Sequence, residues 1–198
     1  MNQKRSLPAY RTLDLMIFAI ILILFESIIV KVSAGRRFSG QAYTVSLAAA
    51  ITGIVYMRWG AWGAMHAVIA GLVFCFMQNA SAQQYMIYAG GNLLSLAALP
   101  IYKKAGRERI RNDKYLFIPV SLSVLLLMQT GRAAIALVLG APMSAALLFY
   151  TTDCLSAVFT VLIVWIAKQQ DGLFEDQFHY LMRLHEEDRE EEEQSESN

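Results

Sequence analysis

Apolar runs close to the length of a membrane crossing constrain this chain more than any other feature. A helix that crosses the ~30 Å hydrocarbon core needs about 20 residues. Six runs are predicted as spans, with approximate bounds at residues 13–33, 42–57, 61–79, 83–101, 115–139 and 143–167. Backbone polar groups in lipid must be paired within the segment, so each run is expected to be helical. The sequence therefore predicts an all-α membrane protein, a bundle of six transmembrane helices.

Composition agrees with a membrane protein. Of the 198 residues, 56% are hydrophobic and only 17% are charged, which is too apolar for an ordinary soluble domain of this length. The net charge is only +1, so the chain lacks the strongly basic character that is typical of nucleic-acid-binding proteins. The first apolar run is too long for a signal peptide, so we expect it to be retained as a span. Two regions follow: a transmembrane domain over 1–170 and a cytosolic segment over 171–198.

The distribution of basic residues predicts the orientation. If the amino terminus is cytoplasmic, only Lys31, Arg36 and Arg37 of the 17 Lys and Arg residues face outward. Thirteen face inward, many of them in the loop between the fourth and fifth runs, and Arg132 lies inside a span. Because cytoplasmic loops are enriched in Lys and Arg, both termini are predicted to be cytoplasmic.

Arg132 lies well inside the fifth run, at a depth where a charge is costly. Such a residue normally faces the protein interior or a polar cavity and finds a partner there. Gln129 precedes it by one helical turn and shares its face. Asp153 in the sixth run and Glu26 in the first are the candidate partners, because both lie about 10–15 Å below the outer end of their helices.

Other side chains reach the same level. Asn92 lies about 14 Å down the fourth run, and the spacing of Tyr85 and Tyr88 places both on its helix face. Phe149 precedes Asp153 by one turn. A few polar groups among aromatic residues are typical of a small-molecule pocket. The candidate substrate-binding residues are Arg132, Asp153, Asn92, Glu26, Gln129, Tyr88, Tyr85, Asn79 and Phe149.

Two interpretations of Arg132 stay open at this point. In the first, Arg132 is ion-paired with Asp153 or Glu26 and only holds the helices in register. In the second, at least one of the three contacts a ligand. The two are compatible, because a partly neutralised arginine still binds a carboxylate or phosphate through paired hydrogen bonds.

Catalytic signatures are missing from the sequence. It contains no His-Glu-x-x-His, no glycine-rich phosphate loop with a lysine and no Gly-x-Ser-x-Gly. The three histidines have no metal-ligand spacing. We therefore expect no enzymatic activity, no metal and no cofactor.

The segment after Lys168 is predicted to leave the membrane. Phe174, Phe178 and Leu181 form one apolar stripe on a short helix that Asp171 is placed to cap. We expect this stripe to lie on the membrane surface or to dock on a partner. The acidic run at 186–196 is expected to be solvated.

Three stretches carry a family resemblance: ITGIVYMRWGAWGAMHAVIAGLVF (51–74), GNLLSLAALP (91–100) and GLFEDQFHYLMRL (172–184). With these segments and its predicted architecture, the chain resembles the S components, the substrate-binding membrane subunits, of energy-coupling factor (ECF) transporters. It departs from them on the first helix, where Ala19 has no alanine four residues away to complete the Ala-xxx-Ala pair that docks many S components on their coupling subunit.

The resemblance implies a function and partners. It implies capture of a vitamin or related micronutrient from the outer face, at the plasma membrane of a bacterium. It also implies a transmembrane coupling subunit and two cytosolic ATPases that supply the energy. Two alternatives stay open on the residues alone: a homo-oligomeric transporter or channel that needs no ATPase, and a membrane assembly or signalling protein without transport.

Overall fold

All the secondary structure in the described part of the chain is helical. The computed structural model describes residues 7–33, 45–170, 172–174, 176–177 and 180–182. Its elements are α1 (Leu7–Ser33), α2 (Ala48–Trp59), η1 (Gly60–Trp62), α3 (Gly63–Met77), α4 (Ala82–Tyr85), η2 (Met86–Gly90), η3 (Leu93–Ala98), α5 (Leu99–Ala105), α6 (Arg107–Asn112), α7 (Phe117–Val138), α8 (Met143–Thr152) and α9 (Cys154–Gln169). The predicted all-α class is confirmed.

Four helical runs in these residues are long and apolar enough to cross a membrane. They are Pro8–Val32, Ala48–Met77, Phe117–Val138 and Met143–Gln169. This supports a membrane protein with at least these candidate spans. The count of six crossing helices stays a prediction.

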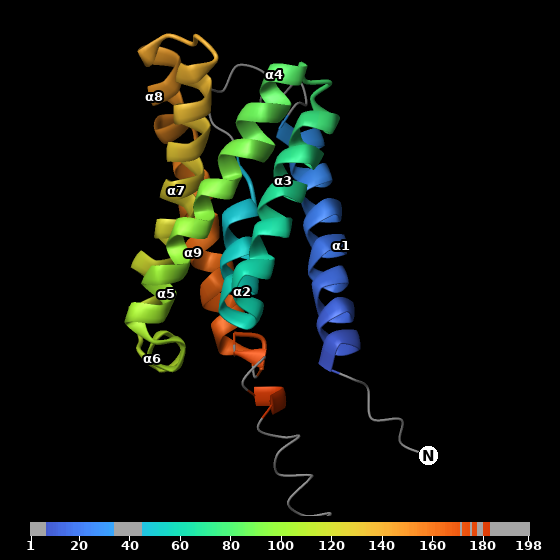
Figure 1. The fold of residues 1–198 in the computed structure, drawn as a ribbon, viewed down its shortest axis with the longest axis vertical. Coiled ribbons are helices and arrows are strands. Elements are labelled where there is room, and N and C mark those ends of the chain that lie inside the picture. Colours follow the sequence, from blue (N-terminus) through green and yellow to red (C-terminus); the bar gives the residue numbers. More distant parts are fainter. Residues whose placement is uncertain (1–6, 34–44, 171, 175, 178–179, 183–198) are drawn as a thin grey trace, which may run out of the picture.

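The run Ala48–Met77 turns back on itself at Gly60. Gly60 has a φ of 61°, a left-handed value that glycine adopts without a steric penalty. A Cβ placed on Gly63 would lie 3.0 Å from the carbonyl oxygen of Thr52, although eleven residues of straight helix would separate the two by about 16 Å. The chain therefore forms a hairpin at this turn, and α2 and α3 lie side by side (Figure 1).

Residues 82–105 form one irregular helical column, from α4 to α5. Its middle is a π-helix, η2, followed by the 3-10 helix η3. Two glycines allow this column to touch α7, because a Cβ on Gly131 would lie only 2.0 Å from the carbonyl oxygen of Gly91. The backbones therefore cross in direct contact, and this crossing brings Arg132 next to Asn92.

One end of the bundle gathers the basic residues. Figure 1 shows the start of α1, the α2–α3 turn, α5, α6 and the end of α9 at the same end. The basic loop 103–114 lies there, whereas the junction between α7 and α8 lies at the opposite end. This topology agrees with the charge distribution that predicts the cytoplasmic side, and we name this end the inner end.

A buried ion pair joins the elements of the inner end. Arg58 donates from Nε and Nη2 to the two carboxylate oxygens of Asp14, at 2.9 and 2.8 Å. Its third nitrogen, Nη1, donates to the carbonyl oxygens of Gly172 and Leu173. The indole Nε1 of Trp59 also donates to Asp14. Arg58 thus connects α1, α2 and the segment after α9. Its position between the second and third predicted spans did not indicate that it is buried.

The segment after α9 packs on its own bundle. Phe174 is buried in the main hydrophobic core, so its predicted place on the membrane surface or on a partner is wrong. An ion pair from Arg107 to Asp176 fixes the segment to the bundle, and within the segment Gln177 donates a hydrogen bond to the carbonyl oxygen of Gly172. Asp171, Phe178 and the acidic run 186–196 lie outside the described residues.

Removing the charge of Asp14 is expected to destabilise the fold. The change Asp14→Asn keeps the shape of the side chain but leaves Arg58 buried without its counter-charge, which costs about 3 kcal/mol. Unfolding of the detergent-solubilised protein by denaturant measures the loss. The matched control is Asp113→Asn at the same end, an exposed residue that accepts hydrogen bonds from the backbone at the start of α7. Asparagine is an equally good cap, so equal losses in both variants would contradict the role of the buried pair.

Candidate functional site

Arg132 is held by three side chains from two other elements and its own helix. Its Nε donates to the Asn92 side-chain oxygen at 2.8 Å, and Nη1 donates to Asp153 Oδ2 at 3.1 Å and to Gln129 Oε1 at 3.4 Å. Gln129 in turn donates to the same Asp153 oxygen. Arg132 and Asp153 are each only 6% exposed and Asn92 is fully buried. The predicted convergence of Arg132, Asp153 and Asn92 at one level is confirmed.

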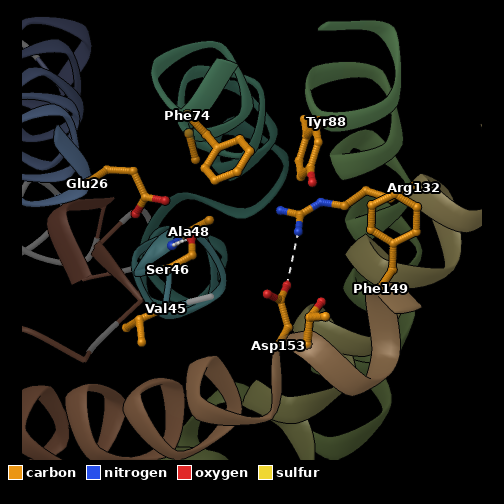
Figure 2. Close-up of a pocket in the computed structure, with 11 residues that line it drawn as sticks. Glu26, Val45, Ser46, Ala48, Phe74, Tyr88, Arg132, Phe149 and Asp153 are labelled. Atoms are coloured by element: carbon orange, nitrogen blue, oxygen red, sulfur yellow. Dashed lines mark hydrogen bonds and ion pairs between the residues drawn. The ribbon is translucent and has the colours of Figure 1, made fainter. Parts of the chain in front are cut away.

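The backbone explains how each of these groups reaches the site. Asn92 follows the π-helix, where the column touches α7, and its amide nitrogen donates to the carbonyl oxygen of Ala67 on α3 at 2.8 Å. Asp153 is the junction between α8 and α9. Its carboxylate enters the interior from this break in the helical run (Figure 2). Arg132 and its partners therefore link α3, α7, η2–η3 and the α8–α9 junction.

Three aromatic rings surround the guanidinium. The Arg132 Cζ atom lies 5.0 Å from the centroid of the Tyr88 ring, a cation–π geometry. Tyr88 in turn packs against Phe74 at 4.5 Å and against Phe149 at 5.9 Å between ring centroids. These rings give the ion pair an apolar flank, and the lower local dielectric there strengthens its electrostatic interactions.

Glu26 occupies the opposite wall. Its Oε2 accepts a hydrogen bond from the backbone nitrogen of Leu47 at 3.0 Å, and the side chain is only 1% exposed. Figure 2 shows it across a hollow from Arg132, beyond Ser46 and Ala48. Asp153 is therefore the residue that pairs with Arg132, whereas Glu26 faces the same space from α1.

A small cavity lies between these walls. Its volume is about 30 Å³, which is room for about one water molecule. No described residue accepts a hydrogen bond from Arg132 Nη2, and in Figure 2 this nitrogen points into the cavity. The lining residues are Glu26, Val45, Ser46, Ala48, Ala70, Phe74, Tyr88, Arg132, Phe149, Thr152 and Asp153.

The nine predicted site residues divide into three groups. Arg132, Asp153, Glu26, Tyr88 and Phe149 line the cavity. Asn92 and Gln129 do not line it but hold Arg132 and Asp153 in place. The remaining two, Tyr85 and Asn79, lie outside the lining.

Local geometry explains the position of these last two residues. Tyr85 is the last residue of α4, and the π-helix follows it directly. The regular α-helical spacing that predicts a shared face for Tyr85, Tyr88 and Asn92 therefore does not apply here. Asn79 lies in the turn after α3, exposed and with a φ of 50°. An asparagine tolerates this left-handed conformation better than most residues, so a turn role accounts for it.

Sequence reasoning missed several lining residues. Phe74 lies in an uninterrupted apolar run, where a cavity-facing ring cannot be told from a lipid-facing one. Ser46 and Ala48 belong to a stretch of small residues that gave only a helix-packing signal. Ser46 also binds the sixth predicted span, because its backbone nitrogen donates to Ser156 Oγ at 3.0 Å.

The described residues include no group of three or more His, Cys, Asp or Glu side chains placed to hold a metal ion. The chemistry that the cavity offers is thus hydrogen bonding, charge and aromatic packing. The chain matches no known protein family, no curated protein and no solved structure.

Adding one methyl group where the helices touch is expected to disturb the site. Gly131→Ala places a Cβ against the backbone of Gly91, which cannot yield without separating α7 from the column, at a cost of about 1–3 kcal/mol. The matched control is Gly90→Ala, whose Cβ meets only the end of the Ile135 side chain at 3.3 Å. Thermal unfolding in detergent compares the two. A Gly131→Ala protein as stable as the Gly90→Ala protein would show that the close crossing is not needed.

Proposed function

We propose that this protein binds a small polar solute in the cavity beside Arg132 and acts as the substrate-binding membrane subunit of an importer of the ECF type. The observation that carries the proposal is the guanidinium itself. Two of its nitrogens are bound by protein groups, while Nη2 points into a cavity whose far wall is a buried carboxylate. Fixed donors and acceptors that face one another across a cavity are typical of ligand sites.

The two walls suggest the chemistry of the solute. Arg132, partly neutralised by Asp153, offers a donor suited to a carboxylate or carbonyl oxygen. Glu26 offers an acceptor for an amine, amide or hydroxyl group on the other side. The rings of Tyr88 and Phe149 between them suit a flat, partly apolar body. A small planar micronutrient with an acceptor at one edge and a donor at the other meets all three.

Binding requires that the cavity enlarge. At about 30 Å³ it is far below the volume of usual ligand pockets, which begin near 300 Å³. Phe149 and Thr152 contribute to the wall from α8, a short helix that ends at the Asp153 junction and carries exposed apolar residues toward the surroundings. We propose that α8 rotates about this junction and so opens the cavity to the solute.

The proposal also includes six crossings. The α2–α3 hairpin supplies two helices, and the column from α4 to α5 supplies another, beside α1, α7 and α8–α9. With the basic inner end in the cytoplasm, both termini are cytoplasmic and the cavity lies in the outer half of the membrane. The solute therefore enters from outside the cell. We assign the membrane that the helices cross as the bacterial plasma membrane.

The interior toward the inner end favours a binding subunit over a channel. Two pairs of buried groups close on each other within the protein, Tyr56 with Ser95 at 2.7 Å and Tyr102 with the carbonyl oxygen of Gly53 at 3.1 Å, while the buried hydroxyls of Thr52 and Thr160 have no partner among the described residues. Apolar side chains fill the space around them. This largely apolar packing is more typical of a binding subunit than of an open pore, so we assign transport to the complex with a transmembrane coupling subunit and two ATPases.

A solute is expected to purify with the protein. Mass spectrometry of small molecules released from the purified wild type measures it, with Glu26→Gln as the test variant. Glutamine keeps an oxygen for the Leu47 amide but loses the charge that the solute meets, and retention is expected to fall about ten-fold. Tyr85→Phe, at the end of α4 and outside the cavity lining, is the control and should retain the solute fully.

Two results would count against the proposal. One is the absence of any molecule that is enriched in the wild type over a double variant, Arg132→Met with Asp153→Leu, which removes the ion pair without stranding either charge. The other is solute flux into liposomes that contain this protein alone, which would favour a transporter that needs no ATPase.

A further inference from the structure

A second hollow lies on the surface of the helix bundle, away from the Arg132 cavity. It is an apolar groove of about 620 Å³ between α7 and α9, near the inner end. It shares no lining residue with the Arg132 cavity. Among the residues that line it are Lys114, Tyr115, Phe117, Ala157, Val158 and Trp165.

The shape of the groove follows from the sizes of its side chains. Ala157 and Val158 are short, so they leave a trough between the larger rings of Tyr115, Phe117 and Trp165. From Ala157 to Trp165 the trough extends along α9 for about 12 Å. Val158 is 64% exposed and Trp165 is 47% exposed, so the protein itself leaves this apolar surface uncovered.

Positive charge is concentrated at the inner mouth of the groove. Lys114 lines it, with its Nζ 5.2 Å from the Tyr115 ring centroid. The Nζ of Lys168 lies 5.1 Å from the Phe117 ring centroid and donates to the backbone carbonyl of Asp113. Hydrogen bonds from the backbone nitrogens of Tyr115 and Leu116 lower the pKa of the Asp113 carboxyl, and this carboxylate caps α7.

We propose that this groove binds an anionic glycerophospholipid of the inner leaflet, with an acyl chain along Ala157 and Val158 and the phosphate at Lys114 and Lys168. Basic residues at the cytoplasmic mouth of a gap between membrane helices are suited to anionic headgroups. Tyr115 and Trp165 are residues that prefer the level of the headgroups. A docked apolar helix would cover the trough equally well, but it would not use the paired lysines, so the charge at the mouth favours the lipid.

The test compares two lipids with identical acyl chains, phosphatidylglycerol and phosphatidylcholine. The purified full chain in detergent receives both in equal amounts, and native mass spectrometry measures the ratio of the two bound species. At about 1 kcal/mol for each lysine near a phosphate, each is worth about a five-fold preference. The wild type should therefore retain phosphatidylglycerol in clear excess, and Lys114→Gln with Lys168→Gln should bring the ratio near one.

Two further variants test whether the lipid preference depends on the lysines at the groove and whether lipid retention depends on the open trough. Lys103→Gln with Lys104→Gln removes two charges from the same end outside the groove, and should leave the ratio unchanged. Val158→Trp, at an exposed position, fills the trough and should lower retention of both lipids. An unchanged ratio in the Lys114 and Lys168 variant, an equal fall in the Lys103 and Lys104 variant, or full lipid retention in Val158→Trp would each overturn the proposal.

Discussion

The ion pair between Arg132 and Asp153 is the interaction on which the arrangement of the helices around the cavity depends. A charge in the membrane interior must be matched, and here the match requires helices from distant parts of the chain to meet at one point. Asn92 and Gln129 complete the shell around the guanidinium, and the Asn92 amide extends it to α3. The glycine crossing at Gly91 and Gly131 is the steric condition for this meeting. Packing and charge therefore specify the same register.

Much of this could be predicted from the sequence, because depth in a membrane is nearly proportional to residue number along a helix. Counting from the ends of the apolar runs placed Arg132, Asp153, Asn92 and Glu26 at one level, and the structure brings the first three into direct contact. Which carboxylate pairs with the arginine could not be predicted. That choice depends on the order of helices around the bundle and on the break at Asp153, and neither leaves a periodic signal.

The remaining differences have two physical causes. Spacing arguments assume a regular α-helix, but the π-helix Met86–Gly90 changes the angle between successive side chains, so Tyr85 leaves the face of Asn92. Burial of the segment after α9 depends on contacts with residues far away in sequence. Phe174 packs in the core because Arg58 and Arg107 hold the neighbouring backbone and Asp176. A local amphipathic pattern carries no information about contacts with Arg58 or Arg107.

Arg58 and Arg132, which are both buried in the described part of the chain, show how a structural ion pair differs from a candidate ligand site. All three nitrogens of the Arg58 guanidinium donate to protein oxygens, two to Asp14 and one to backbone carbonyls. Arg132 has the same kind of counter-charge, yet Nη2 has no acceptor among the described residues and faces a cavity. A guanidinium nitrogen that faces a cavity can donate to a bound molecule, whereas the nitrogens of Arg58 are already used by the protein. This difference between Arg58 and Arg132 supports the proposed binding role of the cavity beside Arg132.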